Sequence, residues 1–265
     1  MIDKEKKRPL EWWEQRQLEE QGCTSGSWES IYVSDATDLS CVRHVRFDGH
    51  VELGAMDPAA GDRVENARIE DCVLGDHVEV GNIGDVLKNC HIGDHARIID
   101  CGRIEFEPET RCGVGTVVEV LDETGTRPVT IFPGLSAQLA LLMARMPKWA
   151  ANHLTPRLSD WLVRFSAPNS IGHHATLRGC KVLINVQVGN EVTIHGAMSL
   201  INGTIVNNAA PGKCLAYVGE GVDAANFIIE DGVADSGAII RNSFIGQGAI
   251  VAKGFSAHDS LFFAN

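Results

Sequence analysis

The chain has 265 residues, enough for one large or two ordinary domains with a sizeable buried core. Its 23 basic and 35 acidic residues give a net charge of −12, which argues against a surface for nucleic acid or for anionic membranes. Aromatic residues make up only 6% of the chain, beside 27 glycines. This composition favours small residues that fill a narrow, regular core, as in a solenoid.

The sequence has no long apolar segment. No signal-peptide pattern lies near its start, and the longest uninterrupted apolar run, 139–144, is far shorter than the ~20 residues that span a bilayer. Eight cysteines are spread along the chain without a C-x-x-C pair, which speaks against a zinc knuckle or a disulfide framework. We therefore expect a cytoplasmic protein with reduced thiols and no membrane contact.

The first element in chain order is a short helix. Pro9 precedes a run that carries Leu10, Trp13 and Leu18 at helical spacing, and Gly22 stands where a C-terminal cap would lie. Residues 1–44 are expected to form this helix and a cap for the domain that follows.

A five-residue pattern then recurs: an aliphatic or small residue, glycine, two variable residues, and a small or β-branched residue. In the best pair of copies Cys72 aligns with Cys90 and His77 with His95, so the register equals the length of three hexapeptides. The copies lie at 60–64, 74–78, 92–96, 112–116, 171–175, 188–192, 218–222 and 245–249.

Three hexapeptides form one triangular coil, and such coils stack at ~4.8 Å, the spacing of paired strands. The aliphatic residue of each copy is expected to point inward, and the small residue four positions later to fill the corner. The glycine is expected at a turn with positive φ. Cys72 and Cys90 are expected to pack inside as compact hydrophobes. The repeat therefore predicts a mainly β chain built as a parallel β-helix.

The repeat is interrupted by a segment of different character. Apolar residues recur at helical spacing over 135–146 and stop at Pro147, and Thr155 begins a second such run. Before them, 122–126 is typical of a hairpin loop between two short strands. The predicted organisation is a first β-helix block, an insertion with a hairpin loop and a helical pair, and a second block: 45–120, 121–167 and 168–265.

Further motifs lie along the whole chain: Gln-Gly-Cys-Thr at 21–24, Leu-Asp-Glu-Thr-Gly at 121–125, Leu-Ser-Ala-Gln at 135–138, Ile-Gly-Gln-Gly at 245–248 and Leu-Phe-Phe-Ala-Asn at 261–265. Together they resemble an uncharacterised bacterial family of hexapeptide-repeat proteins, a domain of unknown function within the left-handed β-helix hexapeptide-transferase superfamily. The resemblance implies a left-handed coil and a homotrimer. Members of the family continue past the last of these motifs, so the chain is expected to be a fragment or a short member.

The commonest activity of that superfamily is acyl transfer from acyl-CoA to a sugar or nucleotide-sugar, with a histidine as general base. Ile-Gly-His-His-Ala at 171–175 is similar to the hexapeptide that carries this base in sugar-nucleotide acyltransferases, with His173 in the matching position. The alternative is that any polar residue suits an exposed turn there. His195 and His258 are secondary candidates. The resemblance thus implies acyl-CoA as co-substrate.

A metal site is a weaker interpretation. The register of the repeat stacks His77 on His95, with Asp76 and Asp94 beside them. A pair of surface ligands rarely defines a zinc site, so no metal is expected.

Two functions remain open at this point. One is a hexapeptide-repeat acyltransferase, favoured because most proteins with this repeat are transferases. The other is a non-catalytic scaffold or binding module, favoured by the interrupted repeat and by the flat coil faces. Either would form a homo-oligomer, because open terminal coils leave unpaired strand edges that must be covered.

Overall fold

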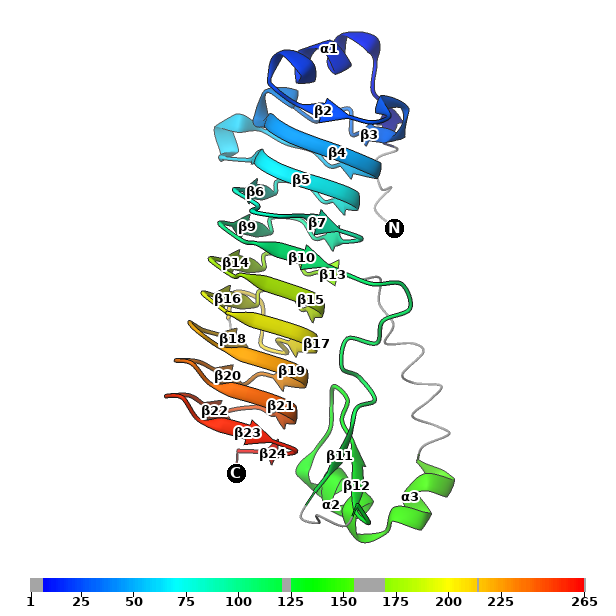
Figure 1. The fold of residues 1–265 in the computed structure, drawn as a ribbon, viewed down its shortest axis with the longest axis vertical. Coiled ribbons are helices and arrows are strands. Elements are labelled where there is room, and N and C mark those ends of the chain that lie inside the picture. The colour runs from blue at the N-terminus through cyan, green and yellow to red at the C-terminus, as the bar shows by residue number, and fades with distance from the viewer. Residues whose placement is uncertain (1–6, 121–124, 155–169, 214, 265) are drawn as a thin grey trace.

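A computed structural model describes residues 7–120, 125–154, 170–213 and 215–264. Most of the described chain is one stack of coils made of parallel strands (Figure 1). A helix covers one end of the stack, and a small insertion lies beside the other end (Figure 1). The chain is thus mainly β, with three α-helices in its described part.

Each coil contributes one strand segment to each of three faces. On the first face, β4 (Val42–Leu53) and β5 (Arg63–Leu74) begin a column that continues through the following strands: β6 (Glu79–Gly81), β9 (Arg97–Ile99), β14 (Thr176–Arg178), β16 (Thr193–His195), β18 (Tyr217–Val218), β20 (Val233–Ala234) and β22 (Ile250–Val251).

The second and third faces share several long strands that turn a corner. These are β4 and β5, which reach all three faces, and β15 (Val182–Val188), β17 (Ser199–Val206), β19 (Asp223–Glu230) and β21 (Ile239–Ile245). The second face also contains β2 (Thr24–Ser25), β7 (Leu87–Lys88), β10 (Arg103–Glu105) and β23 (Ser256–His258). The third also contains β3 (Ile31–Val33), β8 (His91–Ile92), β13 (Ser170–Ile171) and β24 (Leu261–Phe262).

Coil length varies along the stack. Val64 lies beside Val80, and Val80 lies beside Ile98, so the coil that begins at Val64 is two positions shorter than the next one. The step from Leu177 to Ile194 is intermediate in length. The register of three full hexapeptides expected from the best pair of repeats therefore holds locally and not throughout.

The repeat places its side chains inside the stack as predicted. Leu74 and Val78, the first and last residues of one copy, are both fully buried. Cys72 and Cys90 are also buried, and their thiols lie in contact inside the coil. Burial raises the pKa of the Cys90 thiol. These cysteines therefore act as core residues.

In most copies of the repeat, the glycine has a different role from the one predicted. Gly75 does not adopt positive φ; His77, two residues later, does, at 55°. A Cβ on Gly75 would lie 2.8 Å from the backbone nitrogen of Asp94 in the next coil. The glycine is needed because adjacent coils approach closely at this corner. The prediction of a positive φ is wrong at Gly75, whereas it is confirmed at Gly61 and Gly113, where φ is 87° and 77°.

One corner of the stack is lined by a column of side-chain amides that ends in a carboxylate. At the turn from the second to the third face, each amide nitrogen donates to the oxygen of the side chain in the next coil, at 3.0 to 3.4 Å. All of these residues have left-handed backbone angles, which Asn and Asp tolerate better than most residues. We call this column the asparagine ladder: Asn185, Asn202, Asn226, Asn242 and Asp259.

The insertion leaves the stack after β10 and returns at β13. β10 pairs with β7 and β15, and β13 with β8 and β15, so the coil continues across the gap. The coils therefore stop at residue 105, earlier than the boundary at 120 expected from the sequence. The apparent repeat at 112–116 lies in the insertion, where Gly113 packs against the carbonyl oxygens of Asn202 and Phe227.

Within the insertion, β11 (Val117–Glu119) pairs antiparallel with β12 (Pro128–Thr130). Helices α2 (Ala137–Arg145) and α3 (Pro147–His153) follow. Pro147 ends the first predicted helix but also begins α3, and the second predicted helix, from Thr155, lies outside the described residues. The insertion packs on the third face, where Ile228 and Phe244 join its hydrophobic cluster.

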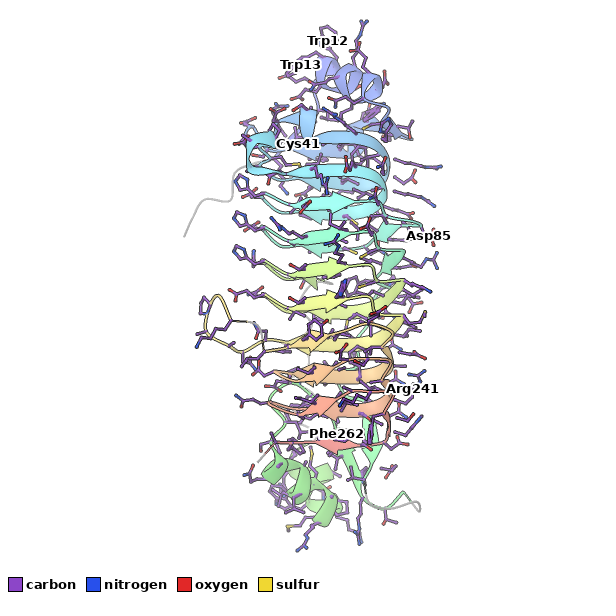
Figure 2. All side chains as sticks on the ribbon, turned by 90° about the vertical axis from the view of Figure 1, so that its left-hand side faces the viewer. Trp12, Trp13, Cys41, Asp85, Arg241 and Phe262 are labelled. Atoms are coloured by element: carbon purple, nitrogen blue, oxygen red, sulfur yellow. The ribbon has the colours of Figure 1, made fainter. Side chains whose placement is uncertain are left out.

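Helix α1 (Trp12–Glu20) covers the end of the stack near β4 (Figures 1 and 2). Leu18 is fully buried beneath it, whereas Trp12 and Trp13 project outward. Arg8, in β1 (Arg8–Pro9), donates two hydrogen bonds to the buried carboxylate of Glu14, at 2.8 and 2.9 Å. Short 3₁₀ helices complete this end: Trp28–Ser30, Leu39–Cys41 and Pro58–Ala60.

We expect Glu14→Gln to lower the free energy of unfolding by about 1–3 kcal/mol at neutral pH, because it weakens a buried charged pair. The hydrogen bonds from Arg8 hold the pKa of Glu14 below its ordinary value of 4.5. The stabilisation of the fold by this ion pair is therefore fully present above pH 4.5, and it is lost as the pH falls through the lower pKa that Glu14 has in the folded protein. Urea titrations should show the wild type and the variant converging in acid; a difference that persists there would contradict this account.

Candidate functional site

Imidazole rings gather along the corner where the third face turns into the first. His77, His95 and His174 occupy equivalent positions in three successive coils, and all three have left-handed backbone angles. The rings of His77 and His95 stack with centroids 5.2 Å apart, and those of His95 and His174 with centroids 4.8 Å apart. We call this corner, from Asp76 to Glu191, the histidine edge.

The side chains of the residues just before these histidines accept hydrogen bonds from the backbone of the neighbouring coil. Asp94 accepts a hydrogen bond from the backbone N–H of Asp76 at 2.9 Å, and Asn190 accepts one from that of His173 at 2.9 Å. His173 makes the equivalent contact, because its Nδ1 accepts a hydrogen bond from the backbone N–H of Asp94 at 3.0 Å. A side-chain acceptor at each of these positions thus holds the turn of the preceding coil.

This contact defines the chemistry of His173. When Nδ1 of a neutral imidazole accepts a hydrogen bond, the proton lies on Nε2. The outer nitrogen of His173 is then a donor. The side chain is 54% exposed, and an Asp94 carboxylate oxygen lies 3.3 Å from Nδ1.

His77 has the opposite arrangement. Its Nδ1 lies 2.8 Å from an Asp62 carboxylate oxygen, and the Asp62 side chain is only 6% exposed. The same oxygen accepts the backbone N–H of Asp57 at 2.8 Å. An ionised carboxylate can only accept hydrogen bonds, so Nδ1 of His77 carries the proton and Nε2 is unprotonated in the neutral ring. This is how a general base is oriented by an acidic partner.

The other two candidate histidines lie elsewhere. His195 is the last residue of β16, beside Arg178 on the first face. His258 is the last residue of β23, beside Arg241 on the second face. The structure therefore does not bring His173, His195 and His258 together at one site.

A family model described as "Domain of unknown function (DUF4954)" matches residues 7–265. The chain belongs to this family. An uncharacterized protein of Treponema pallidum (strain Nichols) is 24% identical over 252 residues, which cover 84% of the chain and 33% of that protein. The chain thus spans about a third of the length of this relative.

The pair of Asp62 and His77 in this DUF4954 chain was not identified from the sequence. Asp62 is the third residue of the repeat copy at 60–64, and the short coil between Val64 and Val80 brings it beside His77. A search for an acidic residue roughly one coil before each histidine, with the coil length left free, would have found it. The register of the best repeat pair pointed to His95 as the neighbour instead.

The described part of this DUF4954 chain holds no group of three or more His, Cys, Asp or Glu side chains arranged for a metal ion. Stacked rings direct their nitrogens in parallel and not toward a shared point. The seven described cysteines are free and buried, and burial raises the pKa of Cys41 to about 11. Because they are enclosed in the core, none of the described cysteines resembles an accessible, activated nucleophile.

A loop adjoins the lower end of the histidine edge. It connects β17 to β18 and projects from the stack (Figure 2). Glu191, which follows His174 in the same column, accepts the backbone N–H of Gly212 in this loop at 2.7 Å. Where the DUF4954 chain is described, none of its helices is long and apolar enough to cross a membrane.

Proposed function

We propose that the chain is a left-handed β-helix acyltransferase of the hexapeptide-repeat class, which moves an acyl group from acyl-CoA to a hydroxyl or amine of a sugar or nucleotide-sugar. The observation that carries this proposal is the pair of His77 and Asp62 at the histidine edge. A general base needs an unprotonated nitrogen and a partner that fixes its tautomer. Coils of three strand segments, several of them close to three hexapeptides in length, support the placement in this class.

In the proposed reaction, the acceptor hydroxyl or amine donates a hydrogen bond to Nε2 of His77. The acceptor atom attacks the thioester carbonyl carbon while its proton moves to Nε2. The Asp62 carboxylate stabilises the imidazolium that forms. The C–S bond then breaks, the new C–O or C–N bond remains, and the leaving CoA sulfur takes the proton from Nε2.

The test is a CoA-release assay with acetyl-CoA and a panel of amino sugars, sugars and nucleotide-sugars. His77→Asn keeps a residue that tolerates the left-handed backbone, and we expect it to lower turnover by ~10²–10⁴-fold. Asp62→Asn should act in the same direction, because its amide would donate to Nδ1 and place the proton on Nε2. His95→Asn, on the same edge, is the matched control and should retain activity.

His173→Asn and single variants of His195 and His258 test the remaining candidates. Loss of turnover in His173→Asn with full activity in His77→Asn would transfer the base to His173. A folded protein that binds no acyl-CoA in calorimetry and turns over no acceptor would reject the transferase. The non-catalytic scaffold would then be the favoured function.

A further inference from the structure

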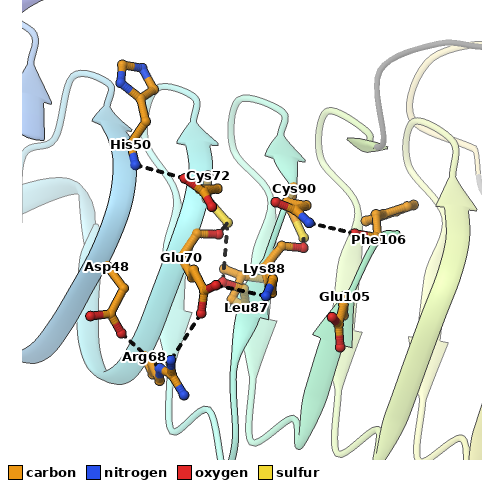
Figure 3. A network of polar contacts seen from close by, with 12 residues as sticks. Asp48, His50, Arg68, Glu70, Cys72, Leu87, Lys88, Cys90, Glu105 and Phe106 are labelled. Carbon is orange, nitrogen blue, oxygen red and sulfur yellow. Dashed lines mark hydrogen bonds and ion pairs between the residues drawn. The ribbon is translucent and has the colours of Figure 1, made fainter. Parts of the chain in front are cut away.

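The second face changes character halfway along the stack. In the upper coils its outward side chains form ion pairs: Arg68 contacts Asp48 and Glu70, and Lys88 contacts Glu70 at 2.8 Å (Figure 3). Arg103 and Glu105 of β10 continue this charged surface. Charged side chains of this kind favour contact with water over burial in an interface.

Below β10 five outward positions of the same face are aliphatic, beside Ser199, Asp223 and Arg241, which remain polar. These side chains are half-buried or exposed, and Ile239 is 38% exposed. The face is turned toward the viewer in Figure 1 across β15, β17, β19 and β21. The insertion packs on the third face, and its hydrophobic cluster contains none of these residues. We call them the apolar band: Val182, Ile184, Ile201, Ala225 and Ile239.

One column of this face begins with an acidic residue, continues through three aliphatic residues and ends with a basic residue. The strand registers align Glu105, Ile184, Ile201, Ala225 and Arg241 one above the other. A carboxylate therefore lies two coils above Ile201 and a guanidinium two coils below it. At ~4.8 Å per coil, each charge is about 10 Å from the central isoleucine. Arg241 also bonds the Asp223 side chain and carbonyl, so its position is fixed.

We propose that the apolar band binds a second copy of this chain about a two-fold axis through Ile201. An axis along the strand direction reverses the order of coils in the partner while it keeps the column facing itself. Ile201 then meets Ile201 of the partner subunit, and Glu105 meets Arg241 of the partner subunit. In the neighbouring column, Val182 and Ile239 lie opposite Asp223 of the partner subunit and Arg103 of the partner subunit, so the apolar contact is confined to the column of Ile201. An isologous interface requires such self-complementarity. The proposal rests on this face alone and is independent of acyl transfer.

Sedimentation velocity over a range of concentrations tests the association. We expect a dimer for the wild type and at least ~10-fold weaker dimerisation for Ile201→Asp, because a carboxylate would be buried opposite its own copy. Thr176→Asp, at a half-buried outward position of the first face, is the matched control and should remain dimeric. A monomer at all concentrations, or an oligomer that Ile201→Asp does not weaken, would overturn the proposal.

A charge exchange tests the arrangement of the two copies. Glu105→Arg and Arg241→Glu should each weaken the dimer, and the double variant should recover it, because opposite charges face again across the axis. Thermal melting of each variant separates loss of folding from loss of association. A double variant that is folded but no more associated than the single ones would exclude this two-fold axis.

Discussion

Gly93→Ala is expected to lower the free energy of unfolding by about 3 kcal/mol or more. A Cβ at this position would lie 2.5 Å from the backbone nitrogen of His173 and 2.7 Å from the carbonyl carbon of Gly172. Backbone atoms of the next coil cannot move aside as a flexible side chain does. Strand pairing holds them in place, because the Gly93 N–H donates to the Ile171 carbonyl at 2.8 Å.

Gly26→Ala is the matched control, since its Cβ would meet no atom within 4 Å and the glycine does not have positive φ. It should change stability by no more than about 1 kcal/mol, in the stabilising direction, through the entropy of the unfolded chain. Guanidinium unfolding followed by far-UV circular dichroism measures both. Equal stability of the two variants would show that the coils do not require close approach at Gly93.

Much of the coil could be predicted because the repeat is a local pattern with a direct physical meaning. An aliphatic residue followed four positions later by a small one predicts which side chains point inward. Leu74 and Val78 confirm this. The helix observed over Trp12–Glu20 lies where Pro9 and Gly22 bracket an amphipathic run.

The same locality explains what could not be predicted. The pattern at 112–116 satisfies the repeat, but nothing in so short a segment indicates whether a neighbouring coil exists to pair with it. The role of the repeat glycine was missed for a related reason. Close approach of Gly93 to His173 joins residues far apart in the sequence, across the insertion. A preference for positive φ is the only glycine property visible locally.

The candidate site depends on small changes in coil length. If every coil had the length of three hexapeptides, His77 would lie beside His95 of the next coil and beside no acidic residue of the preceding coil. The shorter coil between Val64 and Val80 moves Asp62 beside His77, where its buried carboxylate fixes the ring. The sequence predicts His173 as the base, and its local pattern does not indicate that Nδ1 of this ring accepts the backbone N–H of Asp94. Which ring nitrogen of each imidazole carries the proton therefore depends on contacts between coils.

Asn185→Ala is expected to lower the free energy of unfolding by about 2–4 kcal/mol. Asn185 is buried at the point where the insertion leaves the stack. Its Oδ1 accepts the backbone N–H of Glu107 at 2.7 Å, and its Nδ2 donates to the Glu107 carboxylate at 2.8 Å and to Asn202 at 3.1 Å. Alanine would leave these groups without their partner and would also strain the left-handed backbone, where φ is 58°.

Asn66→Ala separates burial from backbone strain. Asn66 has nearly the same φ, 51°, and its amide donates to Asn82 at 3.0 Å, but it lies at a different corner and is more exposed. Water can replace its lost hydrogen bond, so we expect a cost of about 1 kcal/mol, mainly from the backbone. Asn185→Gly removes the amide without the backbone strain and should fall between the two. If urea unfolding gives Asn185→Ala and Asn66→Ala the same stability, the contacts with Glu107 do not stabilise the fold. If Asn185→Ala is less stable by the expected margin, the asparagine ladder also anchors the insertion to the stack.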